Sequence, residues 1–172
     1  MSITKEIQQE MFRDCGTPEH VQLHCNEVAR VAKKIAEALN RNGYHLDVDR
    51  IYGAALVHDV LRVEREHDRV GAEYLIAHGY PEEAELVRHH MKYYPFSEIE
   101  DLKEIDILCL ADRTVREHEF VGIDLRMDYL LQKPGFPAEK KPYIEEARQK
   151  GRAFIHAVEG KIGMPLEELM KE

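Results

Sequence analysis

The heptapeptide AALVHDV, residues 54–60, lies in a strongly apolar segment of this 172-residue chain. Its side chains, and those just before it, are apolar nearly all round, which predicts a buried central helix. Ile51 and Ala55 share one face of that helix with His58, and Asp59 follows directly. A carboxylate among so many apolar side chains is costly unless it is paired or bound to a cation. The doublet His58-Asp59 is therefore the first candidate functional feature.

Helical patterns continue on both sides of this segment, and we find no convincing strand pattern or internal repeat. The central helix is predicted to carry residues 51–62 after a cap at Asp47 or Asp49. Thr17 is a candidate N-cap for the helix before it, with Pro18 at its first position. The other helices are expected at about 3–14, 17–40, 68–78, 81–91, 100–117, 123–132, 139–159 and 165–171. No linker is long or biased enough to divide the chain, so we predict one all-helical domain.

Composition narrows the classes of function. The net charge of -9 argues against a protein that coats nucleic acid, whose phosphates require a basic surface. A small phosphorylated substrate stays compatible, because a bound metal ion can supply positive charge locally. No run of about 18 apolar residues predicts a membrane span, and the N-terminal residues 1–12 lack the apolar region of a signal peptide. Three cysteines without CxxC spacing suggest reduced thiols and a cytoplasmic location.

Two more polar residues lie on apolar helix faces. His24 falls within the stripe of residues 21–39 on the second helix, and Asp112 continues a stripe on the sixth. Each has an ordinary explanation: a core histidine with a hydrogen bond, or an aspartate paired with Arg113 or Arg116. Two inward histidines and two inward carboxylates on three helices nevertheless favour a shared metal site. Imidazole and carboxylate ligands suit Fe, Mn, Zn or Ni, and the absence of thiolate ligands argues against a structural zinc site.

Further histidines and cations accompany this set. His67 begins the fourth helix, and the tandem pair His89-His90 ends the fifth, although either alone is weak evidence for a ligand. Arg62 lies one turn after His58, where it could contact a phosphate or pair with Glu66 at i+4. The weaker candidates for substrate contact are Lys92, Arg113 and Arg116.

The order of these residues resembles the HD-domain superfamily of metal-dependent phosphohydrolases, over roughly residues 17–116. The similar segments are TPEHVQLHCNEVA (17–29), AALVHDV (54–60), HDRVGAEYLIAHGYPEEAELVRHH (67–90) and LCLADR (108–113). The resemblance implies an orthogonal helical bundle of the small, single-domain bacterial type spanning residues 1–172. Its HD core would cover about 17–116, and a helical extension would cover about 120–172.

The resemblance also implies a ligand set. One metal would be held by His24, His58, Asp59 and Asp112. In dinuclear members Asp59 would bridge to a second metal, held also by His67, His89 and His90. Relatives of this kind include HD-type diadenosine polyphosphate hydrolases and, more remotely, cyclic-di-GMP phosphodiesterases. We therefore expect two divalent transition-metal ions (Fe, Mn, Zn or Ni), with Asp59 and Arg62 as the catalytic residues.

The implied function is hydrolysis of a phosphomonoester or phosphodiester by a metal-activated water, on a nucleotide or another small phosphorylated metabolite. The alternatives are an HD-fold di-iron oxygenase and a non-enzymatic, metal-containing binding module. The tripeptide Gly79-Tyr80-Pro81 precedes the tandem histidines, whereas in the HD-GYP phosphodiesterases it follows them. The HDxxED pattern of ppGpp hydrolases is absent, because Val60-Leu61-Arg62-Val63 follows the doublet.

Several points stay open at the level of sequence. The oligomeric state is undetermined, with a homodimer as one alternative. Five histidines are interpreted as structural or surface residues: His20, His45, His78, His118 and His156. The region from about Val121 onward, including Asp124 and Arg126, is left open as a source of side chains that shape a substrate pocket.

Overall fold

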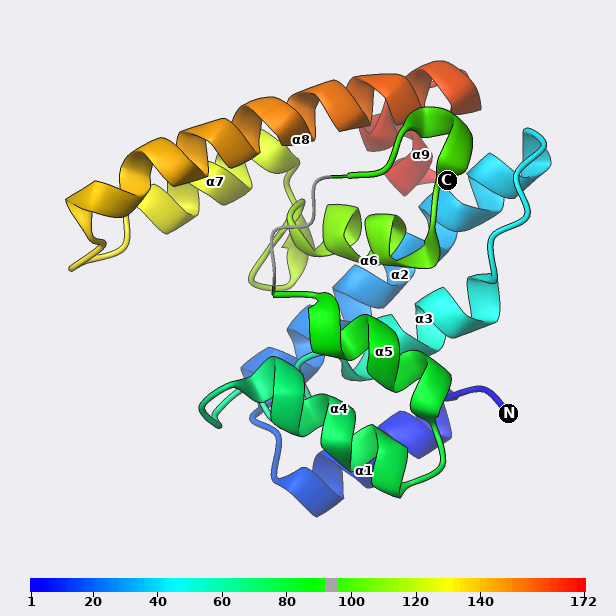
Figure 1. The fold of residues 1–172 in the computed structure, drawn as a ribbon, viewed down its shortest axis with the longest axis vertical. Coiled ribbons are helices and arrows are strands. Elements are labelled where there is room, and N and C mark those ends of the chain that lie inside the picture. Colours follow the sequence, from blue (N-terminus) through cyan, green and yellow to red (C-terminus); the bar gives the residue numbers. More distant parts are fainter. Residues whose placement is uncertain (92–95) are drawn as a thin grey trace.

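A computed structural model of the chain describes residues 1–91 and 96–172, and in them the all-helical prediction is confirmed (Figure 1). The α-helices are α1 (Lys5–Cys15), α2 (Glu19–Arg41), α3 (Val48–Val57), α4 (His67–Ala77), α5 (Pro81–His89), α6 (Glu104–Asp112), α7 (Ile123–Leu131), α8 (Lys141–Ile162) and α9 (Leu166–Lys171). Short 3-10 helices cover Ile99–Asp101 and Ala138–Lys140. A small antiparallel hairpin, β1 (Val115–Arg116) and β2 (Glu119–Phe120), follows α6 and was not expected from the sequence.

Helix α2 is the centre of the bundle. Its inward face is fully buried, as at Val28, Val31 and Ile35, because apolar residues recur there at helical spacing. α3 and α6 pack against it, and the two helices at the C-terminal end of the chain, α8 and α9, also contact it. In Figure 1 the helices α7 and α8 lie at one end of the molecule and α1 and α4 at the other, with α2, α3 and α6 between them.

The central helix ends five residues earlier than its expected limit. α3 stops at Val57, and the chain continues through a series of turns. The imidazole Nδ1 of His58 lies 2.8 Å from the carbonyl oxygen of Ala55, the group that the Asp59 amide would bind in a continued helix. His58 therefore ends the helix by competing for a carbonyl of its last turn, while Asp47 caps its start by accepting from the Arg50 amide.

Two other boundaries differ from expectation. The predicted helix at 100–117 is α6 alone, because the chain turns into the hairpin after Asp112, with Glu117 at φ +56°. Thr17 does not cap α2; Pro18 occupies the N-cap position instead. The Thr17 hydroxyl donates to the carbonyl oxygen of Val60 at 2.7 Å, which ties the start of α2 to the turns after α3.

The α7–α8 hairpin has a small apolar cluster of its own, formed by Ile123, Met127 and Ile144. The buried guanidinium of Arg148 on α8 pairs with Asp124 and Asp128 on α7. Further along, α8 joins the main core through side chains such as Phe154, Val158 and Ile162. Among the helices described, none combines the length and the hydropathy that crossing a membrane requires.

Candidate metal centre

Six of the singled-out side chains meet where α2 passes the ends of the surrounding helices. They are His24 in α2, His58 and Asp59 directly after α3, His67 at the start of α4, His90 directly after α5, and Asp112 at the end of α6. The ligand atoms of five of them form two overlapping groups, each within 4.8 Å: His24, His58 and Asp112, and His58, Asp59 and His90. His67 adjoins the second group through Asp59. Three helices and the ends of two others thus bring residues from 24 to 112 to one place.

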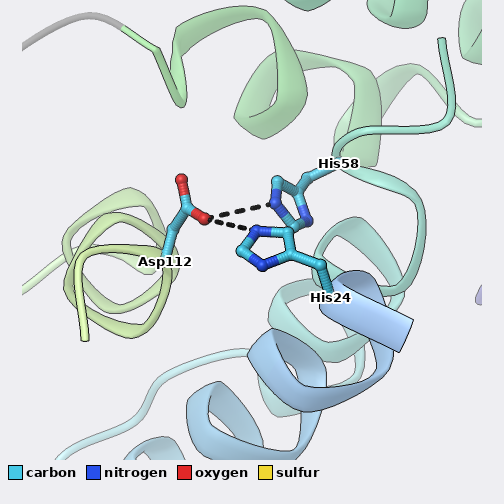
Figure 2. Close-up of side chains that lie close together, drawn as sticks. All are labelled: His24, His58 and Asp112. Carbon is cyan, nitrogen blue, oxygen red and sulfur yellow. Dashed lines mark hydrogen bonds and ion pairs between the residues drawn. The ribbon is translucent and has the colours of Figure 1, made fainter. Parts of the chain in front are cut away.

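The first group is built around the carboxylate of Asp112. Its Oδ1 lies 2.9 Å from Nε2 of His24 and 3.4 Å from Nε2 of His58 (Figure 2). Both imidazoles therefore turn the same ring nitrogen toward one carboxylate oxygen. The His58 ring is completely buried, and the other two side chains keep only narrow access to solvent.

The second group is built around Asp59, whose two oxygens face different histidines. Oδ1 lies 3.1 Å from Nε2 of His90 and 3.3 Å from Nε2 of His67. Oδ2 lies 3.5 Å from Nε2 of His58 and 3.8 Å from Nε2 of His24. Asp59 thus stands between the first group and the pair His67 and His90.

Backbone carbonyls fix the orientation of three of these rings. Nδ1 of His24 lies 2.6 Å from the carbonyl oxygen of Glu117, Nδ1 of His58 lies 2.8 Å from that of Ala55, and Nδ1 of His90 lies 2.6 Å from that of Val87. A carbonyl oxygen only accepts, so Nδ1 must donate in each case. In its neutral form, each ring therefore presents the Nε2 lone pair to the carboxylates, the arrangement found in metal-binding histidines.

These residues fit a divalent metal ion. Nε2 of His58 and of His67 are buried and make no hydrogen bond, although a carboxylate oxygen lies within 3.5 Å of each. Lone pairs of a neutral imidazole and a carboxylate repel each other at this distance, so the site requires a proton or a cation between them. A set of imidazole nitrogens and carboxylate oxygens suits Fe, Mn, Zn or Ni.

Without a metal, the cluster favours a proton on His58. Burial alone would lower the pKa of His58, but the nearby carboxylates of Asp59 and Asp112 hold it well above its usual range. Burial would raise the pKa of both aspartates, yet His58 and the neighbouring imidazoles hold these pKa values well below their usual range. A metal ion must therefore displace a proton from His58 in order to bind there.

The structure pairs His89, the remaining predicted ligand, with a different group. Its Nε2 lies 2.8 Å from Oε1 of Glu85, one turn earlier on α5. Successive residues of a helix point about 100° apart, so the two members of the tandem pair point in different directions. Nε2 of His90 faces Asp59, while His89 faces Glu85; the assignment of His89 as a ligand stays a prediction.

The predicted cationic residues have separate surroundings. Arg62 lines an open cleft that has Asp59 and His24 in its wall. Glu66, its alternative partner, pairs instead with Arg69 at 3.0 Å. Arg113 lies over the ring of Phe96 at 5.0 Å, and Arg116 is on β1; neither belongs to the lining of the cleft as the described residues form it. Lys92 lies outside the described residues.

The cleft has a volume of about 1070 Å³, enough for a ligand of nucleotide size. Its lining adds residues that the sequence analysis did not assign to a site: His20, His118, Arg126, Tyr129 and Lys133. The last three are spaced at i, i+3 and i+7, which places them on one side of α7 and its continuation. This spacing was a usable signal, but only the placement of α7 against the core shows which way that side faces.

Comparison with known proteins agrees with this geometry. The family model described as HD domain matches residues 21–117, more than half of the chain. The chain belongs to the HD domain family. This membership indicates the superfamily of metal-dependent hydrolases. The match includes every residue from His24 to Asp112 in the cluster, and it ends at Glu117, whose carbonyl orients His24.

Similarity to individual proteins is limited. An uncharacterized protein of Methanocaldococcus jannaschii is 36% identical over 72 residues, which are 40% of this chain and 43% of that protein. The chain therefore spans less than half of the length of this curated relative. No solved structure matches the chain significantly. The HD domain family is thus the level at which these comparisons assign the chain.

Proposed function

We propose that this HD domain protein is a metal-dependent phosphohydrolase that acts on a nucleotide or another small phosphorylated metabolite. One observation carries the proposal: imidazole Nε2 atoms converge on the carboxylates of Asp59 and Asp112, beside an open cleft. Metal ions bound by such groups activate water at neutral pH and offset the negative charge of phosphoryl oxygens. The cleft gives a substrate access to these groups.

Two metal ions are part of the proposal. The support is Asp59, whose Oδ2 faces His58 and His24 while its Oδ1 faces His67 and His90. A carboxylate in this position can give one oxygen to each of two ions. His24, His58 and Asp112 would complete the first site, and His67 and His90 would contribute to the second.

The chain supplies further groups for a phosphorylated substrate. Arg62 lines the cleft beside Asp59, and its guanidinium can hold two phosphoryl oxygens at once. Four imidazoles surround the carboxylate of Asp59, which also lines the cleft. A carboxylate oxygen that faces the cleft can accept a hydrogen bond from the attacking water and so orient it. Arg62 would therefore position the phosphoryl group, and Asp59 would position the nucleophile.

The proposal is tested by metal-dependent phosphate release in the absence of oxygen. Metal-free protein is loaded separately with Mn, Fe, Zn and Ni, and is assayed anaerobically on mononucleotides, dinucleoside polyphosphates and phosphodiesters. We expect phosphate release with at least one metal, and its loss by more than about 100-fold in Asp59→Asn. Asp49→Asn, at an exposed position on α3, serves as the control and should keep full activity.

Two results would contradict the proposal. Strict dependence of turnover on O₂ would favour a di-iron oxygenase built from the same ligands. A failure of Asp59→Asn to change either metal content or any activity would favour a binding module without catalysis.

The number of ions is tested separately. His90→Gln removes a group that faces only Oδ1 of Asp59, so it should lower the metal content from two ions to one. The exposed His45 gives the control variant His45→Gln, which should keep both ions. If His90→Gln still binds two ions, or if the wild-type protein binds one, the two-ion arrangement is wrong.

A further inference from the structure

The cleft beside the metal centre carries three cations from separate parts of the chain. Arg62 comes from the turns after α3, Arg126 from α7, and Lys133 from the residues just beyond α7. The last two lie outside the segment 21–117 that matches the HD domain family. The cleft thus has a second group of positive side chains that the metal chemistry does not require.

Arg126 is partly buried, and two of its nitrogen atoms have no partner in the described part of the chain. Its Nε and Nη1 atoms are shielded from solvent and make no hydrogen bond with any described residue. Its guanidinium lies 5.9 Å from the centre of the Tyr129 ring, so an aromatic face holds it in place. Buried donors without an acceptor are unfavourable, and an anion in the cleft would supply the acceptor.

Lys133 adds a second positive charge at the same place. Its Nζ lies 5.1 Å from the centre of the same Tyr129 ring. Burial lowers the pKa of Lys133, and the positive charges of Arg126 and Arg62 lower it further, opposed by Glu117. Three cations are therefore close enough to repel one another, and this repulsion favours the binding of an anion among them.

Tyr129 connects this group to the metal centre. Its hydroxyl donates to Oε1 of Glu117 at 3.4 Å, and the backbone carbonyl of Glu117 accepts from Nδ1 of His24. The ring that supports Arg126 and Lys133 is thus held by the same residue that orients a predicted metal ligand. The cationic group therefore has a defined place relative to the metal centre.

We propose that Arg126 and Lys133, supported by Tyr129, form a second anion-binding subsite that holds a phosphoryl group of the substrate other than the one attacked. The substrate class is then a compound with two or more linked phosphoryl groups, and not a simple phosphomonoester. The inference rests on the proposed function, because it assigns the first phosphoryl group to the metal centre and Arg62. The cleft volume of about 1070 Å³ accommodates both groups.

Binding of two small anions to the metal-loaded protein tests this subsite. The anions are orthophosphate and methylenebisphosphonate, a pyrophosphate analogue that hydrolysis cannot cleave. Isothermal titration is done in buffer with a constant concentration of the same free metal ion. We expect the wild-type protein to bind the bisphosphonate about 10-fold more tightly or better, the factor that one charge-assisted hydrogen bond provides.

The variants separate the subsite from the metal centre. Arg126→Gln/Lys133→Gln should bring the two dissociation constants to within about threefold of each other, without changing orthophosphate affinity or metal content. Lys133→Gln alone should lose part of the preference for the bisphosphonate. Because Lys133 is exposed, this variant keeps the test valid if the double variant does not fold. Lys150→Gln, on the exposed side of α8, should keep the full preference.

Each outcome has one meaning. An unchanged preference in Arg126→Gln/Lys133→Gln overturns the subsite. An equal loss of affinity for both anions also overturns it, because the two cations would then act on the phosphoryl group at the metal. Binding of neither anion to metal-loaded wild-type protein would overturn the proposed function itself. Orthophosphate binding without a preference for the bisphosphonate would overturn only the second subsite.

Discussion

The candidate metal-binding cluster and the α7–α8 hairpin face the same cleft but are held in different ways. In the cluster, His24, His58 and His90 each donate to a backbone carbonyl, and the rings of His58 and His90 are fully buried. The hairpin depends on a small apolar cluster and on ion pairs around Arg148, whose carboxylate partners are about half exposed. The groups that need a fixed geometry are thus tied to the main chain, while those facing a ligand stand on a more weakly supported element.

The largest effect is expected from breaking the cluster itself. His58→Ala should abolish metal binding, because Nε2 of His58 faces both carboxylates, while the helices persist because the apolar core is unchanged. Metal analysis and far-ultraviolet circular dichroism measure the two effects. His45→Ala should change neither. Loss of the helices together with the metal would mean that the cluster, and not the apolar core, holds the fold together.

The two regions should also respond differently to pH. The raised pKa of His58 means that a proton competes with the metal, so metal affinity should increase about tenfold per pH unit below that pKa. Burial would raise the pKa of Asp124, but its ion pairs with Arg152 and Arg148 hold the pKa below its usual value. These ion pairs therefore stabilise the α7–α8 hairpin at neutral pH, and the stabilisation is lost only as the pH falls through the lowered pKa. Between about pH 5 and 8, the metal affinity should change, while the free energy of opening of α7, obtained from hydrogen exchange after correction for the intrinsic pH dependence of exchange, should stay constant. A metal affinity independent of pH would contradict the protonated His58.

A moderate effect is expected from weakening the hairpin. Arg148→Met leaves the carboxylates of Asp124, Asp128 and Glu145 without their shared cation, so the free energy of unfolding should fall by about 1–2 kcal/mol. Chemical denaturation measures this change, and metal content should stay at the wild-type level. Lys150→Met, at an exposed position of the same helix, should have little effect. A loss of metal in Arg148→Met would show that the two regions are not independently supported.

The smallest effect concerns the contact between α7 and α8. A Cβ atom at Gly151 would lie 3.0 Å from Cγ1 and Cδ1 of Ile123, whereas one at Gly160 would have no neighbour within 4 Å. Gly160→Ala should stabilise the protein by about 0.5–1 kcal/mol through helix propensity. In Gly151→Ala the close contact should cancel this gain, for a difference of about 1 kcal/mol between the variants in thermal unfolding. Equal stabilities would mean that α7 moves away from α8 at no cost.

Periodicity alone predicted much of this molecule. It placed His24 and Asp112 on inward faces, and the helical fold followed from the same pattern. The early end of α3 was missed, because it depends on the His58 ring taking the Ala55 carbonyl. The strands β1 and β2, of two residues each, are too short to show an alternation of apolar and polar side chains. That the structure draws only His90 of the tandem pair to Asp59 follows from helix geometry, but the sequence did not show which member faces inward.

The far wall of the cleft could not be predicted for a different reason. Arg126 and Lys133 reach it because α7 packs on α8, and that packing joins residues 20 to 28 positions apart, such as Arg148 with Asp128 and Arg152 with Asp124. No local pattern encodes such a contact. The candidate metal ligands lie on or directly after helices with strong apolar faces, whereas the cleft wall depends on a small apolar cluster and on ion pairs between α7 and α8.

The turn at Glu117 has a consequence for how this protein can diversify. Its left-handed backbone directs one carbonyl to His24, and its side chain accepts from Tyr129. Changes of sequence on the N-terminal side of this turn reach the metal ligands, and changes in the following segment 122–140 reach the opposite wall of the cleft. Substitutions in this segment can therefore change the cleft wall without touching the cluster directly, except at Tyr129, which contacts Glu117. Glu117 is thus the residue through which the two sides of the cleft are connected.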